Sequence, residues 1–195
     1  MEEFNEEYWQ SRWETGKTGW DIGYASPALV DFAKTFNDEE IKILIPGCGN
    51  GYEAEELHKL GYKNTHALDL APGAFHSLQN RYPDFPEGNM ILGDFFEFNG
   101  RFDLILEQTF FCAINPNLRR AYAQKMIELL EPGGTLAGLL FDAPLLTDHP
   151  PFGGSKEVYR PFFEDLFELK TFERSTKSIP PRAGKELFIQ FVKPH

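Results

Sequence analysis

The chain has 195 residues, and its 19 Lys and Arg stand against 30 Asp and Glu, which gives a formal net charge of −11. The acidic balance argues against nucleic acid, because phosphate binding needs basic surface, and the 42% hydrophobic content excludes whole-chain disorder. Two cysteines are too few for a disulfide scaffold, and no run of about 18 apolar residues predicts a membrane span. We therefore expect a cytoplasmic monomer with no nucleic-acid or membrane partner.

The N-terminal part predicts a short helix followed by a glycine-containing loop. Residues 4–14 carry Trp9 and Trp13 at i, i+4 spacing, which places both rings on one face of a helix. The loop over 15–25 contains three glycines and also Trp20. Residues 1–25 are interpreted as a lid segment. Packing of the helical tryptophans into the core is the alternative.

Strands and helices alternate through the next hundred residues. A helix begins after Ser26 as N-cap, with Pro27 at its first position. The expected strands cover residues 41–45, 64–70, 89–93, 102–107 and 135–141. The expected helices between them cover 52–60, 71–82 and 115–130, and residues 132–134 form a turn. Alternation of this kind predicts a parallel sheet covered by helices on both faces.

The pattern changes after residue 141. A loop rich in Pro and Gly at 144–154 leads to a helix over 156–167. Two later stretches, 169–175 and 186–192, have the composition of paired strands and predict an antiparallel hairpin. We expect one domain over 1–195. Its parts are the lid at 1–25, a cofactor-binding α/β core at 41–141 and a substrate-side loop, helix and hairpin at 142–195.

A glycine-rich loop follows the first expected strand. Residues 47–51 read GCGNG, with Gly47 and Gly49 where a ligand crevice opens at the carboxyl edge of an α/β sheet. Tyr52 replaces the third glycine of the dinucleotide pattern, and no Gly-Lys-Ser/Thr follows, so a P-loop is excluded. The G-x-G-x-G spacing is typical of S-adenosylmethionine-dependent methyltransferases. A tight strand–helix turn without a ligand is the alternative.

Carboxylates end the next two strands. Asp69 lies 22 residues after Gly47, at a position where an acidic side chain accepts both hydrogens of a ribose diol. Asp94 follows the third strand and is interpreted as an acceptor for an adenine amino group, with the backbone N–H of Phe95 donating to the ring. For both aspartates a helix-cap or turn role is the alternative.

Several segments together resemble a known family. They are 8–21 (YWQSRWETGKTGWD), 45–49 (IPGCG), 110–116 (FFCAINP) and 148–152 (DHPPF). The chain is similar to thiopurine S-methyltransferase-like enzymes and, within them, to the plant-type halide/thiol methyltransferases. The resemblance implies S-adenosylmethionine as cofactor and a Rossmann-like class I methyltransferase fold. That fold is a seven-stranded, mostly parallel sheet with a C-terminal antiparallel hairpin and an N-terminal helical lid.

The resemblance also implies a set of cofactor contacts. By motif they fall on Trp9, Trp13, Trp20, Gly47, Asp69, Asp94, Phe95 and Gln108, and the glycine pattern adds Gly49. At position 108 relatives carry Arg or Tyr, so Gln108 departs from the family. The tryptophans suit this role independently, because aromatic faces attract a sulfonium cation.

The expected chemistry is methyl transfer to a small soft nucleophile, namely a thiol, hydrosulfide, halide or thiopurine. Such acceptors arrive nucleophilic, and the sequence contains no base motif and no metal-binding motif. His149 is the one weak catalytic candidate. A methyltransferase for O or N acceptors, a nicotinamide-dependent oxidoreductase on a similar sheet and a non-catalytic binding module are the alternatives.

Overall fold

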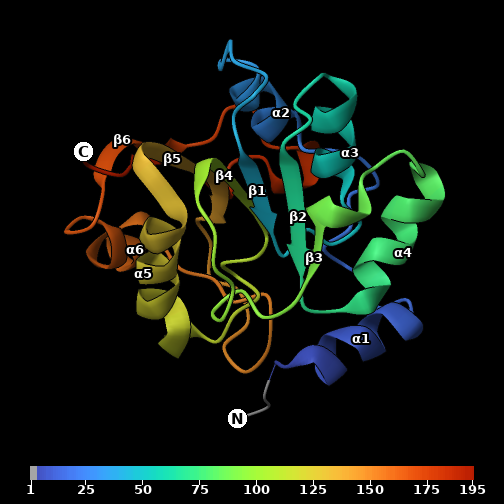
Figure 1. The fold of residues 1–195 in the computed structure, drawn as a ribbon. Helices are drawn as coiled ribbons and strands as arrows, with labels where there is room; N and C mark the ends of the chain where they lie inside the picture. The colour runs from blue at the N-terminus through green and yellow to red at the C-terminus, as the bar shows by residue number, and fades with distance from the viewer. Residues whose placement is uncertain (1–3) are drawn as a thin grey trace. The chain divides into compact units, whose positions relative to one another are not determined.

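The computed structural model describes residues 4–195 as two compact parts, 4–98 and 99–195. The strands of both parts belong to one seven-stranded sheet, in the order β3-β2-β1-β4-β5-β7-β6. The sheet is parallel except for a C-terminal antiparallel hairpin, so the predicted fold class is confirmed. Figure 1 labels the helices α1–α6 and the strands β1–β6.

The first part contains three parallel strands and four helices. The strands are β1 (Ile43–Pro46), β2 (Thr65–Asp69) and β3 (Met90–Leu92), and the helices are α1 (Glu6–Glu14), α2 (Pro27–Ala33), α3 (Tyr52–Lys59) and α4 (Pro72–Arg81). All four residues of β1 are buried. Asp69 pairs in register with Leu92, so the carboxyl ends of β2 and β3 reach the same edge. This edge carries the residues predicted to bind a cofactor.

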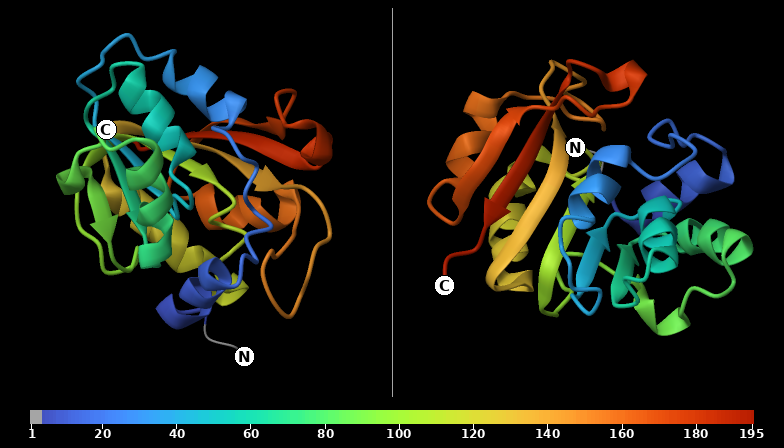
Figure 2. Two further views of the ribbon diagram at one scale, coloured as in Figure 1. Left: turned by 90° about the vertical axis from the view of Figure 1, so that its right-hand side faces the viewer. Right: turned by 90° about the horizontal axis from the view of Figure 1, so that it is seen from above.

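The second part contains one parallel and two antiparallel strand pairs. Its strands are β4 (Phe102–Gln108), β5 (Leu130–Phe141), β6 (Glu168–Arg174) and β7 (Glu186–Val192), and its helices are α5 (Arg119–Leu129) and α6 (Lys156–Phe163). Strand β4 runs parallel to β5, while β7 lies antiparallel between β5 and β6, as the right-hand view of Figure 2 shows. The hairpin expected at the end of the chain is therefore present.

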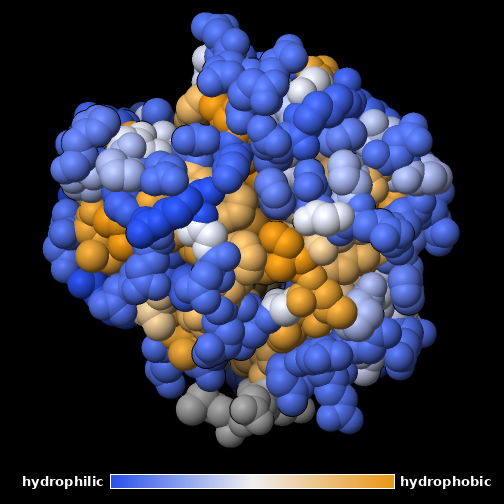
Figure 3. All heavy atoms as spheres, in the orientation of Figure 1, coloured by the Kyte–Doolittle hydropathy of each residue, from blue (hydrophilic) through white to orange (hydrophobic). Residues whose placement is uncertain are grey.

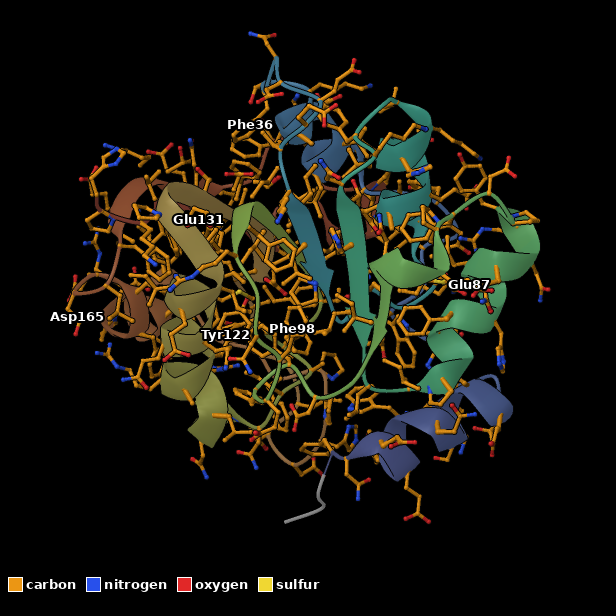
Figure 4. The ribbon with its side chains drawn as sticks, viewed as in Figure 1. Phe36, Glu87, Phe98, Tyr122, Glu131 and Asp165 are labelled. Atoms are coloured by element: carbon orange, nitrogen blue, oxygen red, sulfur yellow. The ribbon has the colours of Figure 1, made fainter. Side chains whose placement is uncertain are left out.

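Aromatic rings fill the core of the second part. Phe111 meets Tyr122 edge-on at 4.9 Å between ring centroids, and Phe163 lies 5.1 Å from Phe191. All four side chains are fully buried. In Figure 4, Tyr122 lies on the strand-facing side of α5, whereas Asp165 lies at the surface. The core thus joins both helices to the hairpin.

Two predicted boundaries in the second part are wrong. The expected turn at 132–134 lies inside β5, where the pairing with β4 jumps from Leu130 to Thr135. The main chain there forms hydrogen bonds with Lys193, near the C-terminus. Gly133 N–H donates to the Lys193 carbonyl at 3.0 Å, and Lys193 N–H donates to the Gly134 carbonyl. Helix α6 also ends at Phe163 rather than at residue 167.

Short 3-10 turns and small shifts account for the other boundary differences. Helix α1 begins two residues later than predicted, because Asn5 is its N-cap and accepts a hydrogen bond from Tyr8 N–H. Asn115 caps a 3-10 turn at Pro116–Leu118, which precedes α5. Two further 3-10 turns cover Glu87–Asn89 and Pro180–Arg182.

The surface drawn in Figure 3 is mainly hydrophilic, with smaller apolar areas between the polar ones. Across residues 4–195 the exposed large apolar side chains lie at scattered positions, namely Tyr24, Leu60, Leu92, Leu118, Leu146 and Val158. Within the same range no helix has both the length and the apolar character that crossing a membrane requires.

Candidate functional site

The glycine loop between β1 and α3 has a backbone that other residues adopt only under strain. Gly47, Gly49 and Gly51 have φ angles of +59°, +54° and +68°, in the left-handed region. Glycine occupies this region without steric cost. The loop is also tied to the next strand, because Cys48 N–H donates to the Leu68 carbonyl at 3.0 Å. The G-x-G-x-G pattern is thus explained by local geometry.

Asp69 joins the glycine loop to the start of α4. Its Oδ2 accepts a hydrogen bond from Gly49 N–H and its Oδ1 accepts one from Ala71 N–H, each at 3.0 Å. Burial raises the pKa of this carboxyl, and the backbone N–H groups oppose that rise. Asp69 is not the N-cap of α4, which is Ala71. Each carboxylate oxygen has a second lone pair, so Asp69 keeps acceptor capacity for a ligand.

The three tryptophans gather against the glycine loop. Trp20 meets Trp9 and Trp13 edge-on, with ring centroids 5.6 and 5.7 Å apart. A Cβ added at Gly49 would lie 3.4 Å from the indole nitrogen of Trp20, so this ring covers the loop closely. All three rings are half-buried, and α1 contains no buried residue. The tryptophans are thus neither fully exposed nor fully buried, and both the lid and the packed helix stay predictions.

The N-terminal segment is held by contacts with both α4 and the glycine loop. Gln10 Oε1 accepts from Gly73 N–H in the first turn of α4 at 3.0 Å. A Cβ at Gly73 would lie 2.8 Å from Trp13, so the absence of a side chain there permits the contact. Asn50 Nδ2 donates to Asp21 Oδ2 at 2.7 Å. In Figure 1, α1 lies beside the start of α4.

Asp94 is exposed and forms a local turn. Its Oδ1 accepts from Phe96 N–H at 2.8 Å, and its main-chain carbonyl accepts from Glu97 and Phe98 N–H. Phe95, the next residue, is buried. The turn role that the sequence left open for Asp94 is therefore present, and its contact with a cofactor stays a prediction.

Gln108 ends β4 in the second part of the chain and is half-buried. Its Oε1 is buried and has no hydrogen-bond partner among the described residues. Thr109, which follows it, has a φ of +63°, a left-handed conformation that costs a β-branched residue free energy. A strained residue beside an unpaired polar atom is typical of a functional position.

His149 bonds to its own loop. Its Nδ1 lies 2.9 Å from the Pro150 carbonyl, and its Nε2 lies 4.0 Å from Asp148 Oδ1. The side chain is 44% exposed. Both contacts lie within the loop that carries His149. Among residues 4–195, no three His, Cys, Asp or Glu side chains group as metal ligands.

Sequence reasoning missed three polar residues that shape these sites. Gln10 and Asp21 attach the N-terminal segment, and Glu107 accepts two backbone hydrogen bonds beside Gln108. For Glu107 a signal was available, because it is a carboxylate at the end of a buried strand, like Asp69. For Gln10 no local pattern exists, since its partner is 63 residues away.

Comparison with known proteins decides the family. The model of the thiopurine S-methyltransferase family matches residues 4–188. The chain belongs to this family. It is therefore an S-adenosylmethionine-dependent methyltransferase, as the motifs predicted.

Relatives in the family carry sulfur-directed names. The chain is 31% identical over 184 residues to probable thiol methyltransferase 2 of Arabidopsis thaliana. The aligned region covers 91% of this chain and 81% of the relative. It is 32% identical over 187 residues to thiocyanate methyltransferase 1 of Brassica oleracea, with the same coverage. Thiopurine S-methyltransferase of Vibrio vulnificus is 24% identical over 205 residues, and the match covers 95% of this chain and 93% of the relative.

Solved structures share the fold at low sequence identity. One, reported for the conversion of a disulfide bond into a thioacetal group during echinomycin biosynthesis, has a TM-score of 0.77 at 21% identity and covers 97% of this chain and 92% of its own. A Burkholderia thailandensis 1,6-didemethyltoxoflavin-N1-methyltransferase has a TM-score of 0.73 at 17% identity, with coverage of 97% and 87%. These likenesses concern the fold alone.

Proposed function

We propose that this family member transfers a methyl group to a small soft nucleophile, namely a thiol, hydrosulfide, thiocyanate, halide or thiopurine. The observation that carries this acceptor class is the 31–32% identity, over 91% of the chain, to proteins named thiol and thiocyanate methyltransferases. The conversion of thiols and of thiocyanate needs the same chemistry, attack by sulfur on a methyl carbon.

The first part of the chain supplies the proposed cofactor contacts. Asp69 accepts from the ribose hydroxyls, while Gly47 and Gly49 let the backbone approach the cofactor. Asp94 accepts a hydrogen bond from the adenine amino group, and Phe95 N–H donates one to the adenine ring. The tryptophans face the sulfonium, where the cation–aromatic attraction contributes roughly 2 kcal/mol once water is excluded. The residues of this set are Trp9, Trp13, Trp20, Gly47, Gly49, Asp69, Asp94 and Phe95.

Gln108 is proposed as the contact from the second part. Its unpartnered Oε1 is a buried acceptor that a hydrogen-bond donor of the cofactor or the acceptor would satisfy. The Arg that the family resemblance implies there would only donate, and the alternative Tyr hydroxyl would both donate and accept. The substitution therefore changes which ligand group suits this position.

The reaction demands little acid–base chemistry from the chain. The cofactor supplies an activated methyl group on a sulfonium. The protein holds the acceptor in line with that group and keeps water out, which are effects of positioning and desolvation. An acceptor that is already anionic needs no general base. His149, tied to its own loop, is assigned no catalytic role.

A screen with labelled cofactor tests the proposal. Thiols, hydrosulfide, thiocyanate, iodide, thiopurines, phenols and amines are offered, and methylated products are counted. We expect turnover with sulfur acceptors and iodide. Calorimetric titration with S-adenosylmethionine and with NADH separates methyl transfer from hydride transfer. Cofactor binding without turnover of any acceptor would instead indicate a binding module.

Cell location and assembly complete the proposal. Cys48 and Cys112 are both free and buried, which suits a reducing compartment such as the cytoplasm. We propose a monomer acting on small molecules. Light scattering measures the mass directly, and a dimer would contradict this part.

The N-terminal segment is expected to act as a lid that ligand binding orders. Helix α1 has no buried residue, and Gln10 and Asp21 attach the segment through hydrogen bonds that can open, so it should be mobile without ligand. Hydrogen exchange over residues 5–22 should slow when S-adenosylhomocysteine is added. Gly73→Ala places a Cβ 2.8 Å from Trp13 and should raise exchange in this range in both states.

The matched control for the lid is Gly88→Ala, because a Cβ at Gly88 meets nothing within 4 Å. Exchange over 5–22 in this variant should equal that of the wild type. Strong protection of the wild-type segment before any ligand is added would contradict a lid and favour a permanently packed helix.

A further inference from the structure

Glu107 is a fully buried carboxylate near the end of β4. Its Oε1 accepts hydrogen bonds from Phe110 N–H at 2.9 Å and from Phe111 N–H at 2.8 Å. Its Oε2 has no hydrogen-bond partner among the described residues. Oε1 thus accepts hydrogen bonds from two consecutive backbone amides, while Oε2 is a buried acceptor without such a bond among the described residues.

These two amides belong to a constrained turn. The turn begins at Gln108, passes through the left-handed Thr109 and ends at Cys112, whose Sγ donates to the Thr109 carbonyl at 3.2 Å. Phe152 N–H donates to the Cys112 carbonyl at 2.7 Å. A left-handed threonine persists only where neighbouring bonds hold it. Glu107 provides two of those bonds, directly beside the proposed ligand contact Gln108.

The surroundings of Glu107 contain charged and titratable groups from each neighbouring element. They are Glu186 of β7, Arg182 before it, Arg119 and Tyr122 of α5, Cys112 of the turn and Tyr159 of α6. Arg182 pairs with Glu186 at 3.6 Å, and Arg119 donates to the Gly153 carbonyl at 3.1 Å.

The ionised form of Glu107 is therefore costly near neutral pH. Burial raises its pKa to about 7, and the charge of Glu186 adds to this effect, while the two amide bonds oppose it. A carboxylate accepts more strongly than a carboxylic acid, because charge-assisted hydrogen bonds are roughly twice as strong as neutral ones. The hydrogen bonds from Phe110 N–H and Phe111 N–H to Glu107 should accordingly become stronger when the Glu107 carboxyl loses its proton.

We propose that Glu107 is a positioning residue for methyl transfer, whose carboxylate fixes the turn 108–112 and with it Gln108, more firmly when ionised than when protonated. The proposal rests on the proposed function for its kinetic consequence only. Glu107 itself has no exposed surface. It acts through the backbone amides and does not contact the acceptor.

The first test observes the amides without any turnover. In the wild type the amide proton resonances of Phe110 and Phe111 should shift as pH rises from about 5.5 to 8.5, with a midpoint near the raised pKa of Glu107. Glu107→Gln keeps a carbonyl oxygen for the amides and removes the charge, so its two resonances should not titrate. Resonances that stay fixed in the wild type would overturn the proposal, whatever acceptor the enzyme uses.

The second test follows the rate with iodide or thiocyanate, neither of which gains or loses a proton in this range. Wild-type kcat should rise about fivefold over the same pH interval, following the stronger charge-assisted bonds. Glu107→Gln should match the wild type at pH 5.5 and stay at that level at pH 8.5. KM for the cofactor should change less than kcat.

Two variants control the kinetic test. Asp165→Asn removes an exposed carboxylate that pairs with Arg120, and its pH profile should equal that of the wild type. Glu186→Gln removes the second buried carboxylate and should retain the rise. A rise that survives in Glu107→Gln and disappears in Glu186→Gln would overturn the assignment to Glu107. Absence of turnover with every acceptor would contradict the proposed function instead. In that case the amide proton resonances of Phe110 and Phe111 still test the role of Glu107.

Discussion

Asp69→Ala is expected to weaken S-adenosylmethionine binding by about tenfold to hundredfold. A charge-assisted hydrogen bond contributes roughly 1.5–3 kcal/mol, and the ribose would lose its carboxylate acceptor. The structure adds a second cause, because Gly49 and Ala71 N–H lose the oxygens that they bond to. The glycine loop should therefore be less well placed for the cofactor. Calorimetry gives the dissociation constant directly.

Two further variants separate these causes. Asp69→Asn keeps one neutral acceptor and removes the charge, so its loss should be smaller than that of Asp69→Ala. Glu87→Ala removes an exposed carboxylate of the same part of the chain and should leave binding unchanged. An unaltered dissociation constant in Asp69→Ala would remove Asp69 from the site.

The pH dependence of binding follows from the same residue. Burial raises the pKa of Asp69 above that of an ordinary aspartate. Its anionic form is the one that accepts from the ribose, so affinity should fall as pH falls through the raised pKa. The decline should begin at a higher pH than an exposed aspartate would give, and Asp69→Asn should lack it.

Local chemistry drew attention to the glycine loop and to Asp69 in the sequence. Three glycines in five residues were enough, since the backbone at 47, 49 and 51 is left-handed and only glycine adopts it without cost. Asp69 was found because parallel strands end at one edge of a sheet. The sequence did not show that Asp69 also bonds to the loop, because that bond links residues 20 positions apart.

Non-local pairing explains the failures. Pro132-Gly133-Gly134 has the composition of a turn, yet it continues β5 because the segment bonds to Lys193 at the far end of the chain. Glu107 stands after the apolar Leu104-Ile105-Leu106, and its strand-end position was a usable signal. Its two amide bonds depend on the left-handed Thr109, a conformation that residue type does not predict.

The rate of methylation of a cysteine-like thiol is expected to rise about fiftyfold between pH 6.5 and 8.5. The thiolate is the nucleophile, and a pKa of about 8.5 makes roughly 1% of the thiol ionised at the lower pH and half of it at the upper. Iodide has no proton to lose, so with iodide only the smaller rise assigned to Glu107 should remain. Both profiles are measured on one preparation. Dividing the thiol rate by the iodide rate at each pH cancels the contribution of Glu107.

His149→Ala tests whether the protein itself removes the thiol proton. The ring is half-exposed and bonded to its own loop, so the iodide reaction should be nearly unchanged and the thiol reaction only modestly slower. A loss of about 10²-fold or more with the thiol alone is the size that general-base catalysis produces, and it would overturn the base-free mechanism. An enzyme that uses neither acceptor but methylates a phenol or an amine would overturn the acceptor class as well.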